Sequence, residues 1–290
     1  MKLLVDISQI CYRCFFADMR ENQEFSQKNI GFFKHLVISS ILMVKKKYVV
    51  ASSDIYLCAD HKITWRKQIF SYYKANRKKT RDASKIDFQQ LYDMMNLFYV
   101  DLKNVFPFHF IQTKYAEGDD CIGCLAQHFS ESGEDFVIIS SDSDFVQLHS
   151  LPGFRGQFDT IGKNVRGDKP KKQLFVKILN GDPGDGIPNV LSDDDTFVND
   201  SKRQKPLGEK KAFKILSSND SLKEFLEDKN IARNFKRNRR LIDLSRTPVQ
   251  IKEKILKKYF TSNPKLDTTI LYAYFHGHEM NILKNRVNEF

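Results

Sequence analysis

Short apolar runs alternate with stretches of helical periodicity through the first half of the sequence, and this alternation limits the possible folds most. The four runs predicted as strands are residues 3–7, 55–59, 108–113 and 136–140. The predicted helices between them are residues 28–47, 87–104 and 118–129. Helices between apolar strands are typical of a parallel sheet that is covered on both faces. The sequence therefore predicts an α/β fold with a mostly parallel central sheet flanked by helices.

The chain changes character beyond residue 150. Residues 150–175 contain glycines and basic residues, and we expect edge strands among them. Residues 181–190 (GDPGDGIPNV) are predicted to form a turn-rich hinge, followed by a polar, flexible loop over residues 191–206. Residues 208–216 are predicted to begin a helix, residues 220–260 to form further basic helices, and the last thirty residues to pack back on the body. These features place a domain boundary between residues 176 and 177.

The charge of the chain indicates the kind of partner it binds. Lys and Arg number 47 against 36 Asp and Glu, which gives a net charge of +11 in 290 residues. Such an excess favours a polyanion, either a nucleic acid or a membrane surface. No apolar run approaches the ~20 residues of a membrane span. The apolar N-terminus meets Asp6 early, so we interpret it as a first strand and not as a signal peptide.

Five cysteines include two pairs with C-x-x-C spacing. They are Cys11, Cys14, Cys58, Cys121 and Cys124. Because each lies beside apolar residues and their number is odd, we expect small core residues in a reducing cytoplasm. A zinc site built from both pairs is the alternative.

Acidic residues follow each predicted strand. The four clusters are Asp6, then Asp60, then Glu117 with Asp119 and Asp120, and finally Asp142 with Asp144. A fifth pair, Asp182 and Asp185, lies in the hinge. Because functional groups of open α/β sheets gather outside the carboxyl ends of the strands, we expect these carboxylates to meet at one edge. Any single one of them is more often a helix cap than a metal ligand, but capping does not easily explain acids after four strands.

Carboxylates gathered in this way need compensating cations. Two unit charges ~4 Å apart interact by about 4 kcal/mol at an effective dielectric near 20. Oxygen ligands select Mg²⁺ or Mn²⁺. A site rich in carboxylates suits two metals about 3.5–4 Å apart, which activate a water and stabilise the leaving oxygen of a phosphodiester.

A basic segment follows Asp60. Its cations are Arg66, Lys67, Lys74, Arg77, Lys78, Lys79 and Arg81, and its aromatic residues are Trp65, Tyr72 and Tyr73. Cations interleaved with aromatics suit a single nucleic-acid strand, because phosphates meet cations and bases stack on rings. Lys74 or Arg66 could also stabilise charge on a transferring phosphate. The alternative is a solvated basic helix.

The hinge offers a second contact for phosphate. Its glycines, Gly181, Gly184 and Gly186, permit a tight turn whose backbone amides can face an anion. A helix, this turn and the helix from residue 208 would form a clamp on a duplex backbone. An ordinary proline–glycine loop is the alternative, but it leaves Asp182 and Asp185 unexplained.

The chain resembles the flap endonuclease/5′-nuclease family, and within it the primer-removing ribonuclease H enzymes of T-even phages. The matching stretches are LLVDIS, LCADHKITWRKQIFSYYKANRKK, AEGDDCIG, VIISSDSDF, GDPGDGIPNV and the terminal NRVNEF. The resemblance implies a PIN-like α/β core with a helix–turn–helix clamp and a smaller helical C-terminal region. Residues 1–176 would then be a metal-dependent nuclease core with a basic bridge or arch at 61–90, and residues 177–290 the duplex-binding and helical domain.

The resemblance also assigns residues to roles. The first of two Mg²⁺ ions, for which Mn²⁺ can substitute, would be held by Asp6, Asp60, Glu117, Asp119 and Asp142. The second would be held, partly through waters, by Asp120, Asp144, Asp182 and Asp185. These acids and Lys74 form the expected catalytic set. The expected nucleic-acid contacts are Arg66, Tyr72, Tyr73, Lys74, Arg77, Lys78, Gly181, Gly184, Gly186, Lys210 and Lys211.

The family's pattern is not matched everywhere. Gly118 stands where alanine is usual, and Gly186 and Asn189 replace the usual asparagine and glycine of the hinge. Residues 191–207 also separate the hinge from its second helix more widely than in most relatives.

The resemblance implies 5′→3′ exonuclease and flap endonuclease activity on RNA–DNA and DNA–DNA duplexes with 5′ ends or flaps. It further implies a monomer in the host cytoplasm of a phage, with no membrane partner. A single-stranded-DNA-binding protein and a sliding clamp are the expected protein partners. Two alternatives are a PIN-like ribonuclease and a non-catalytic nucleic-acid-binding module.

Overall fold

A central sheet of five parallel strands organises the computed structural model, which describes residues 1–22, 27–84 and 86–290. The strands are β1 (Lys2–Asp6), β2 (Ile55–Cys58), β3 (His109–Ile111), β4 (Phe136–Ile139) and β5 (Phe154–Phe158). Their order is β3-β2-β1-β4-β5, and every pair is parallel. The predicted α/β class is confirmed, and the expected edge strand is β5.

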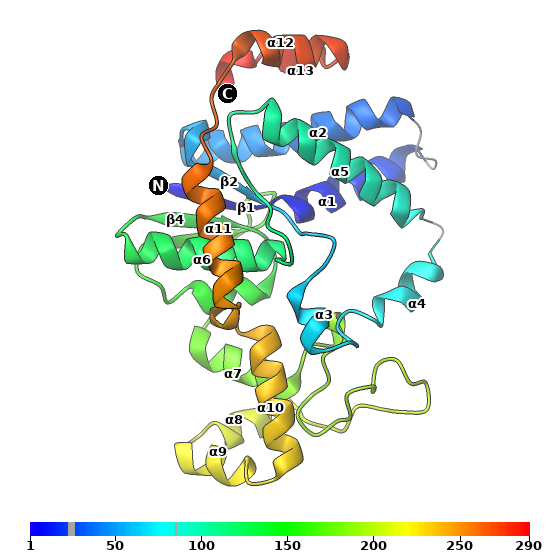
Figure 1. Cartoon of the computed structure of the whole chain (residues 1–290), viewed down its shortest axis with the longest axis vertical. Coiled ribbons are helices and arrows are strands. Elements are labelled where there is room, and N and C mark those ends of the chain that lie inside the picture. Colours follow the sequence, from blue (N-terminus) through cyan, green and yellow to red (C-terminus); the bar gives the residue numbers. More distant parts are fainter. Residues whose placement is uncertain (23–26, 85) are drawn as a thin grey trace.

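Helices cover both faces of the sheet (Figure 1). Residues from α1 (Ile7–Asn22), α2 (Gln27–Tyr48) and α5 (Phe88–Asn104) share one apolar core with Leu3 and Val5 of β1. Residues from α6 (Gly118–Glu131) and α11 (Val249–Thr261) share the other core with Leu4. Alternate residues of a strand point to opposite faces, so one apolar strand supplies both cores.

Helix α1 was not among the predicted elements. Its buried apolar residues are Ile7, Ile10, Cys11, Cys14 and Phe15. Their spacing of three and four is the helical pattern, so the signal was present. Because this run follows directly on the apolar strand β1, the two elements were not separated in the sequence.

All five cysteines are buried in the two cores, as expected for packing residues. Cys11 and Cys14 lie in the core against α2. Cys58, Cys121 and Cys124 lie in the core on the opposite face of the sheet. The two C-x-x-C pairs are therefore separated by the sheet and cannot share one zinc ion.

Two short helices lie in the basic segment between β2 and α5. They are α3 (Trp65–Ile69) and α4 (Arg77–Asp82). Figure 1 shows this segment extending to one side of the sheet before the chain returns through α5.

A third apolar core lies beyond the sheet, among helices of the second half (Figure 1). The helices there are α7 (Pro170–Asn180), α8 (Glu209–Ile215), α9 (Asn219–Phe225) and α10 (Lys229–Ile242). Residues 170–175 are helical, which corrects the expectation of edge strands there; Pro170 occupies the first turn, where its missing N–H costs nothing. The predicted domain boundary at 176/177 falls inside α7.

The C-terminal residues return to the sheet, as predicted. Helices α12 (Thr268–Gly277) and α13 (Asn281–Lys284) end the chain. The rings of Phe275 and Phe290 pack on Phe106, at centroid distances of 6.0 and 5.8 Å. Short 3₁₀ helices occupy Ser52–Asp54, Ser143–Leu148, Pro183–Asp185, Leu244–Arg246 and Val287–Glu289. In the parts of the chain that the structure describes, no helix has the length and apolar character to cross a membrane.

Candidate active site

The strand order creates a topological switch point at the carboxyl end of β1. The chain proceeds from β1 to β2 and β3 on one side, and β4 and β5 lie on the other. Crossovers therefore diverge beside β1, and ligands of open α/β sheets bind at such a point. Asp6 ends β1, Asp60 follows β2 and Asp142 follows β4. The acidic residues after these strands thus share the edge predicted for them.

Four of these acids have no cationic partner in an ion pair of the described chain, and we call them the open acidic set. They are Asp6, Asp60, Asp119 and Asp142. Neutral groups orient Asp6 and Asp60 instead. Ser140 Oγ donates to Asp6 Oδ2 (3.2 Å), and the Gln9 amide donates to Asp6 Oδ1 (3.0 Å). The Gly118 amide donates to Asp60 Oδ1 at 2.7 Å.

The pKa values of Asp6 and Asp119 show that the open acidic set is crowded. Burial, together with the charges of Asp60 and Asp142, raises the pKa of Asp6 to about 7. Burial and the charges of Asp142 and Asp6 raise the pKa of Asp119 well above its ordinary value. These carboxylates therefore lie within Coulombic range of one another, and the positive charge of Lys74 only partly opposes the upward shift at Asp119.

The donors of the open acidic set fit a hard divalent cation. Carboxylate oxygens are the ligands that Mg²⁺ and Mn²⁺ prefer. Among the described residues, no three Asp, Glu, His or Cys side chains converge closely enough to hold one ion by themselves. Mg²⁺ commonly keeps several waters and takes only one or two carboxylates. The arrangement is therefore compatible with a hydrated ion.

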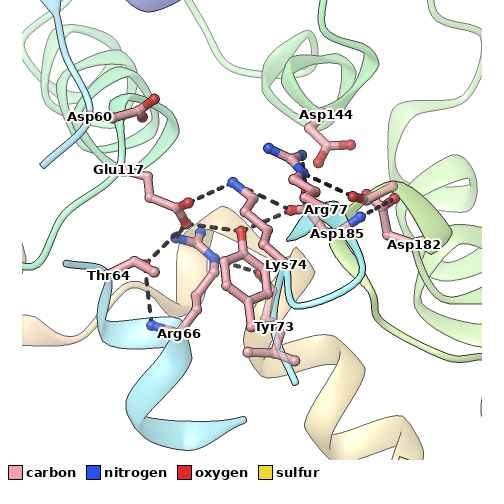
Figure 2. Close-up of polar contacts among 12 residues, drawn as sticks. Asp60, Thr64, Arg66, Tyr73, Lys74, Arg77, Glu117, Asp144, Asp182 and Asp185 are labelled. Carbon is pink, nitrogen blue, oxygen red and sulfur yellow. Dashed lines mark hydrogen bonds and ion pairs between the residues drawn. The ribbon is translucent and has the colours of Figure 1, made fainter. Parts of the chain in front are cut away.

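A second group of acids is already neutralised by the protein, and we call Glu117, Asp120 and Asp185 the paired acidic set. Arg66 donates to both Glu117 and Asp120, each at 2.8 Å. Arg77 contacts Asp185 at 2.6 Å. Figure 2 shows the contacts around Glu117 and Asp185 as one network, with Asp60 outside its dashed lines.

Asp120 is fully buried and its oxygens are occupied. Oδ2 accepts from Trp65 Nε1 (3.0 Å), Arg66 and the Glu117 amide, and Oδ1 accepts from Thr247 Oγ1 (2.7 Å). It therefore joins α3, α6 and the turn before α11. In this conformation Asp120 holds the fold together, which corrects the expectation that it is a metal ligand.

Glu117 is held by two cations and two hydroxyls. Lys74 Nζ donates to Oε1 at 2.6 Å, and Tyr73 and Thr64 donate to Oε2. Burial raises the pKa of Glu117, but Lys74 and Arg66 outweigh it and bring this pKa down to about 2. Metal binding by Glu117 would require Lys74 to move, so its expected ligand role does not fit this conformation.

Asp144 and Asp182 share a single cation, Lys177 of α7. Lys177 Nζ contacts Asp182 at 2.8 Å and also donates to Asp144. Burial raises the pKa of Asp144 to about 6 although Lys177 opposes this shift. One lysine for two carboxylates leaves one negative charge in excess. Lys177 was not singled out in the sequence; its signal was a lone lysine in the apolar stretch that leads into the hinge.

The basic segment is partly buried. Arg66 and Tyr73 are only 3% and 2% exposed. Neither side chain is accessible to a nucleic acid in this conformation, which corrects the expectation for these two residues. Tyr72, Arg77 and Lys78 are exposed, as strand contacts require.

The basic segment is attached to the hinge. Asn76 Nδ2 donates to the Pro183 carbonyl (2.7 Å), and the Lys74 amide donates to the Asp185 carbonyl (2.7 Å). Lys74 adopts a left-handed backbone with φ of 57°, which is costly for a residue with a side chain. This conformation aims its ammonium group between Glu117 and Asp185 (Figure 2).

Two departures from the family pattern have structural explanations. Gly186 has φ of 70° and ψ of 22°, a left-handed conformation that glycine and asparagine both tolerate. Asn189 is fully buried, and its side chain bonds the Lys205 carbonyl, the Leu191 amide and Ser192. Asn189 therefore fastens the long loop of residues 191–207 to the hinge.

The remaining predicted contacts lie around the hinge and α8. The backbone of Gly181 is left-handed, and a Cβ there would lie 2.3 Å from the Ile187 carbonyl. Gly184 is exposed in the turn Pro183–Asp185, and Lys210 and Lys211 are exposed in the first turn of α8. The predicted helix–turn–helix is thus α7, the hinge and α8, with a long loop inserted.

Each half of the chain matches a known protein-family model. Residues 1–153 match the N-terminal resolvase-like domain of 5′-3′ exonucleases. Residues 163–290 match the C-terminal region of T4 RNase H. The ribonuclease H of Enterobacteria phage T4 is 28% identical, over 99% of this chain and 95% of that protein. The 5′-3′ exonuclease of Bacillus subtilis is 27% identical, over 78% of this chain and 73% of the relative.

Other relatives are longer or are similar mainly in fold. The chain spans about a quarter of DNA polymerase I of Streptococcus pneumoniae, at 28% identity. The flap endonuclease of bacteriophage T5, solved as a pseudo-enzyme–product complex with DNA and metal ions, aligns with a TM-score of 0.66 at 16% identity. That alignment covers 91% of this chain and 99% of the T5 chain. The chain therefore belongs to the 5′-3′ exonuclease family and carries the C-terminal region characteristic of T4 ribonuclease H.

Proposed function

We propose that this member of the 5′-3′ exonuclease family hydrolyses phosphodiesters at 5′ ends and flaps, removing RNA primers and adjoining DNA during phage replication. The observation that carries the proposal is the open acidic set at the switch point. Four carboxylates there lie within Coulombic range of one another and form no ion pair in the described chain, while the neighbouring acids are paired. Such a concentration of negative charge is suited to divalent ions and, through them, to a phosphodiester.

We assign the open acidic set, in part through bound waters, to the first of two Mg²⁺ ions and the pair Asp144 and Asp182 to the second. Bound divalent ions would supply an activated water and stabilise the leaving oxygen. Ser140 and the Gly118 amide hold Asp6 and Asp60 in place for this role. The ammonium group of Lys74 lies close to the acids, so it could leave Glu117 and form an ion pair with a substrate phosphate instead.

The substrate surface extends from the basic segment to α8. Tyr72, Arg77 and Lys78 would contact the 5′ strand, and Lys210 with Lys211 would contact the duplex backbone. The T4 and T5 relatives, named a ribonuclease H and a flap endonuclease, support RNA–DNA and DNA–DNA duplexes as substrates. We extend the proposal to a monomer in the host cytoplasm that cooperates with a single-stranded-DNA-binding protein and a sliding clamp.

Mapping of cleavage products tests the proposal. A 5′-labelled RNA–DNA hybrid and a 5′-flap DNA are incubated with the protein at increasing Mg²⁺. Short products released from the 5′ end of the hybrid, and cleavage near the flap junction, are expected only with metal. Cleavage of single-stranded RNA alone would favour a PIN-like ribonuclease. Metal-independent binding without any product would favour a non-catalytic binding module.

A further inference from the structure

Helix α10 carries an exposed stripe of cations that the proposed active site does not use. Its sequence, KNIARNFKRNRRLI, has six basic and no acidic residues. Four of them recur at helical spacing, and we call Lys229, Arg233, Lys236 and Arg240 the basic stripe. Positions i, i+4, i+7 and i+11 lie on one face of a helix. All four residues are exposed.

The opposite face of α10 is fixed to the hinge. Asn238 Nδ2 donates to the carbonyls of Ile178 and Pro188, both at 2.9 Å. Asn234 Nδ2 donates to the Val190 and Ser192 carbonyls. Both asparagines are buried. The hinge and the basic stripe are therefore presented by one packed unit, and binding at one orients the other.

The basic stripe is largely without counter-charge. Arg233 contacts Asp194 at 2.9 Å, whereas no ion pair of the described chain involves Lys229, Lys236 or Arg240. The neighbouring cations of α10 differ, since Arg237 pairs with Asp194 and Arg239 lies 3.6 Å from Asp243. Like charges three and four residues apart destabilise a helix when nothing neutralises them.

We propose that the basic stripe binds the phosphate backbone of double-stranded nucleic acid outside the stretch held by the active site and the hinge. Eleven residues of helix span about 16 Å. A duplex presents a phosphate about every 3.4 Å along each strand, so several phosphates fall within that length. A protein partner would need an aromatic or aliphatic anchor. The stripe offers charge alone, which fits a polyanion. This inference rests on the proposed function, because it extends the same substrate surface.

The test compares two variants with equal loss of charge. The stripe variant carries K229Q, R233Q, K236Q and R240Q. The control carries K103Q, K254Q, K257Q and K265Q, four exposed lysines on and after α5 and α11. Binding to an intact 30-base-pair duplex is measured without divalent metal, over a series of salt concentrations. Thermal unfolding of each variant establishes that it is folded.

Each phosphate contact contributes about 0.9 to the slope of log K against log salt. The stripe variant is expected to lose about 3 to 4 from that slope, with affinity falling about 10-fold or more at moderate salt. The control should keep its slope within about 1. Equal slopes and affinities for the two variants would overturn the inference and leave an acidic protein as the candidate occupant.

Two further details keep the test decisive. If the stripe variant unfolds, the pair K236Q and R240Q replaces it, with an expected slope change of about 2. Because binding is measured on uncleaved duplex without metal, the result is separate from that of the cleavage assay. A protein that binds through the stripe but never cleaves would refute the proposed function and support this inference.

Discussion

The open and the paired acidic sets lie at the same edge of one sheet and differ in how the fold balances their charge. In the paired set, Arg66, Lys74 and Arg77 supply three positive charges for three carboxylates. In the open set, none of the four carboxylates forms an ion pair in the described chain, and the donors to Asp6, Asp60 and Asp142 are neutral. Asp144 and Asp182, which share Lys177, are intermediate because one positive charge balances two carboxylates.

The difference separates structural acids from acids that are free to take a ligand. Buried carboxylates that are matched by cations and hydrogen bonds hold segments together, and removing one partner is costly. Carboxylates that lie close together without an ion-pair partner repel one another, and a divalent ion that binds them removes this repulsion. Residues of similar chemistry, spaced only one or two positions apart, thus have opposite roles.

The largest expected effect comes from neutralising an open acid. Asp142→Asn should lower the cleavage rate by about 10³–10⁴-fold, or some 4–5 kcal/mol, because charge that attracts the metals is lost. Stability should hold or increase, since repulsion falls. Initial rates on a 5′-flap DNA and thermal unfolding measure both quantities. Glu253→Gln, on the exposed face of α11, is the control. A variant that retained full activity would remove Asp142 from the site.

Neutralising a cation of the paired set should act mainly on stability. Arg66→Met leaves Asp120 and Glu117 buried with fewer partners and is expected to cost about 3 kcal/mol of unfolding free energy. Urea denaturation measures this quantity. Lys67→Met, an exposed neighbour on the same helix, should change it by less than about 0.5 kcal/mol. Equal stability of the two variants would contradict the description of this set as structural.

The two sets should also respond to pH with opposite signs. The folded-state pKa of Asp6 is raised to about 7, so its contribution to stability is complete below about pH 4 and is lost as pH rises to 7. After allowance for its partial exposure, the loss is about 2 kcal/mol without metal. Asp6→Asn should flatten this part of the stability profile, and Mg²⁺ should restore stability at pH 8.

Glu117 should show the reverse dependence. Its pKa is lowered to about 2, so its contribution is present above about pH 4.5 and is lost as pH falls towards 2. Denaturation of the metal-free protein at closely spaced pH values resolves the two trends. An Asp6→Asn protein with an unchanged profile between pH 4 and 7 would show that the open set is not electrostatically strained.

The smallest effect, a change in Mn²⁺ affinity, is expected where one lysine forms ion pairs with two acids. Lys177→Met frees Asp144 and Asp182 and should tighten binding of the weaker Mn²⁺ ion by about 10-fold, or 1.4 kcal/mol. Titration followed by electron paramagnetic resonance measures the free ion. Lys172→Met, one turn and a half earlier on α7, is the matched variant. Weaker Mn²⁺ binding in Lys177→Met would instead mean that the lysine orients the two acids.

Part of the site was predictable from local sequence. Residues such as Asp6 and Asp142 follow apolar strands directly, and parallel strands bring their carboxyl ends to one edge. The hinge was likewise marked by its glycines and prolines. The strand at residues 2–6 was predicted, but the helix of residues 7–22 was missed because it continues the apolar run of the strand directly.

What the sequence alone determined was the α/β class, the edge at which the acids gather and the net positive charge, since these depend on strand order and composition. Only the tertiary structure decided which acids are balanced. Arg66 and Lys74 contact Glu117 from 51 and 43 residues away in the sequence. Lys177 contacts Asp144 from 33 residues away. Coulombic balance depends on distances between side chains in three dimensions, and residue order along the chain does not fix those distances.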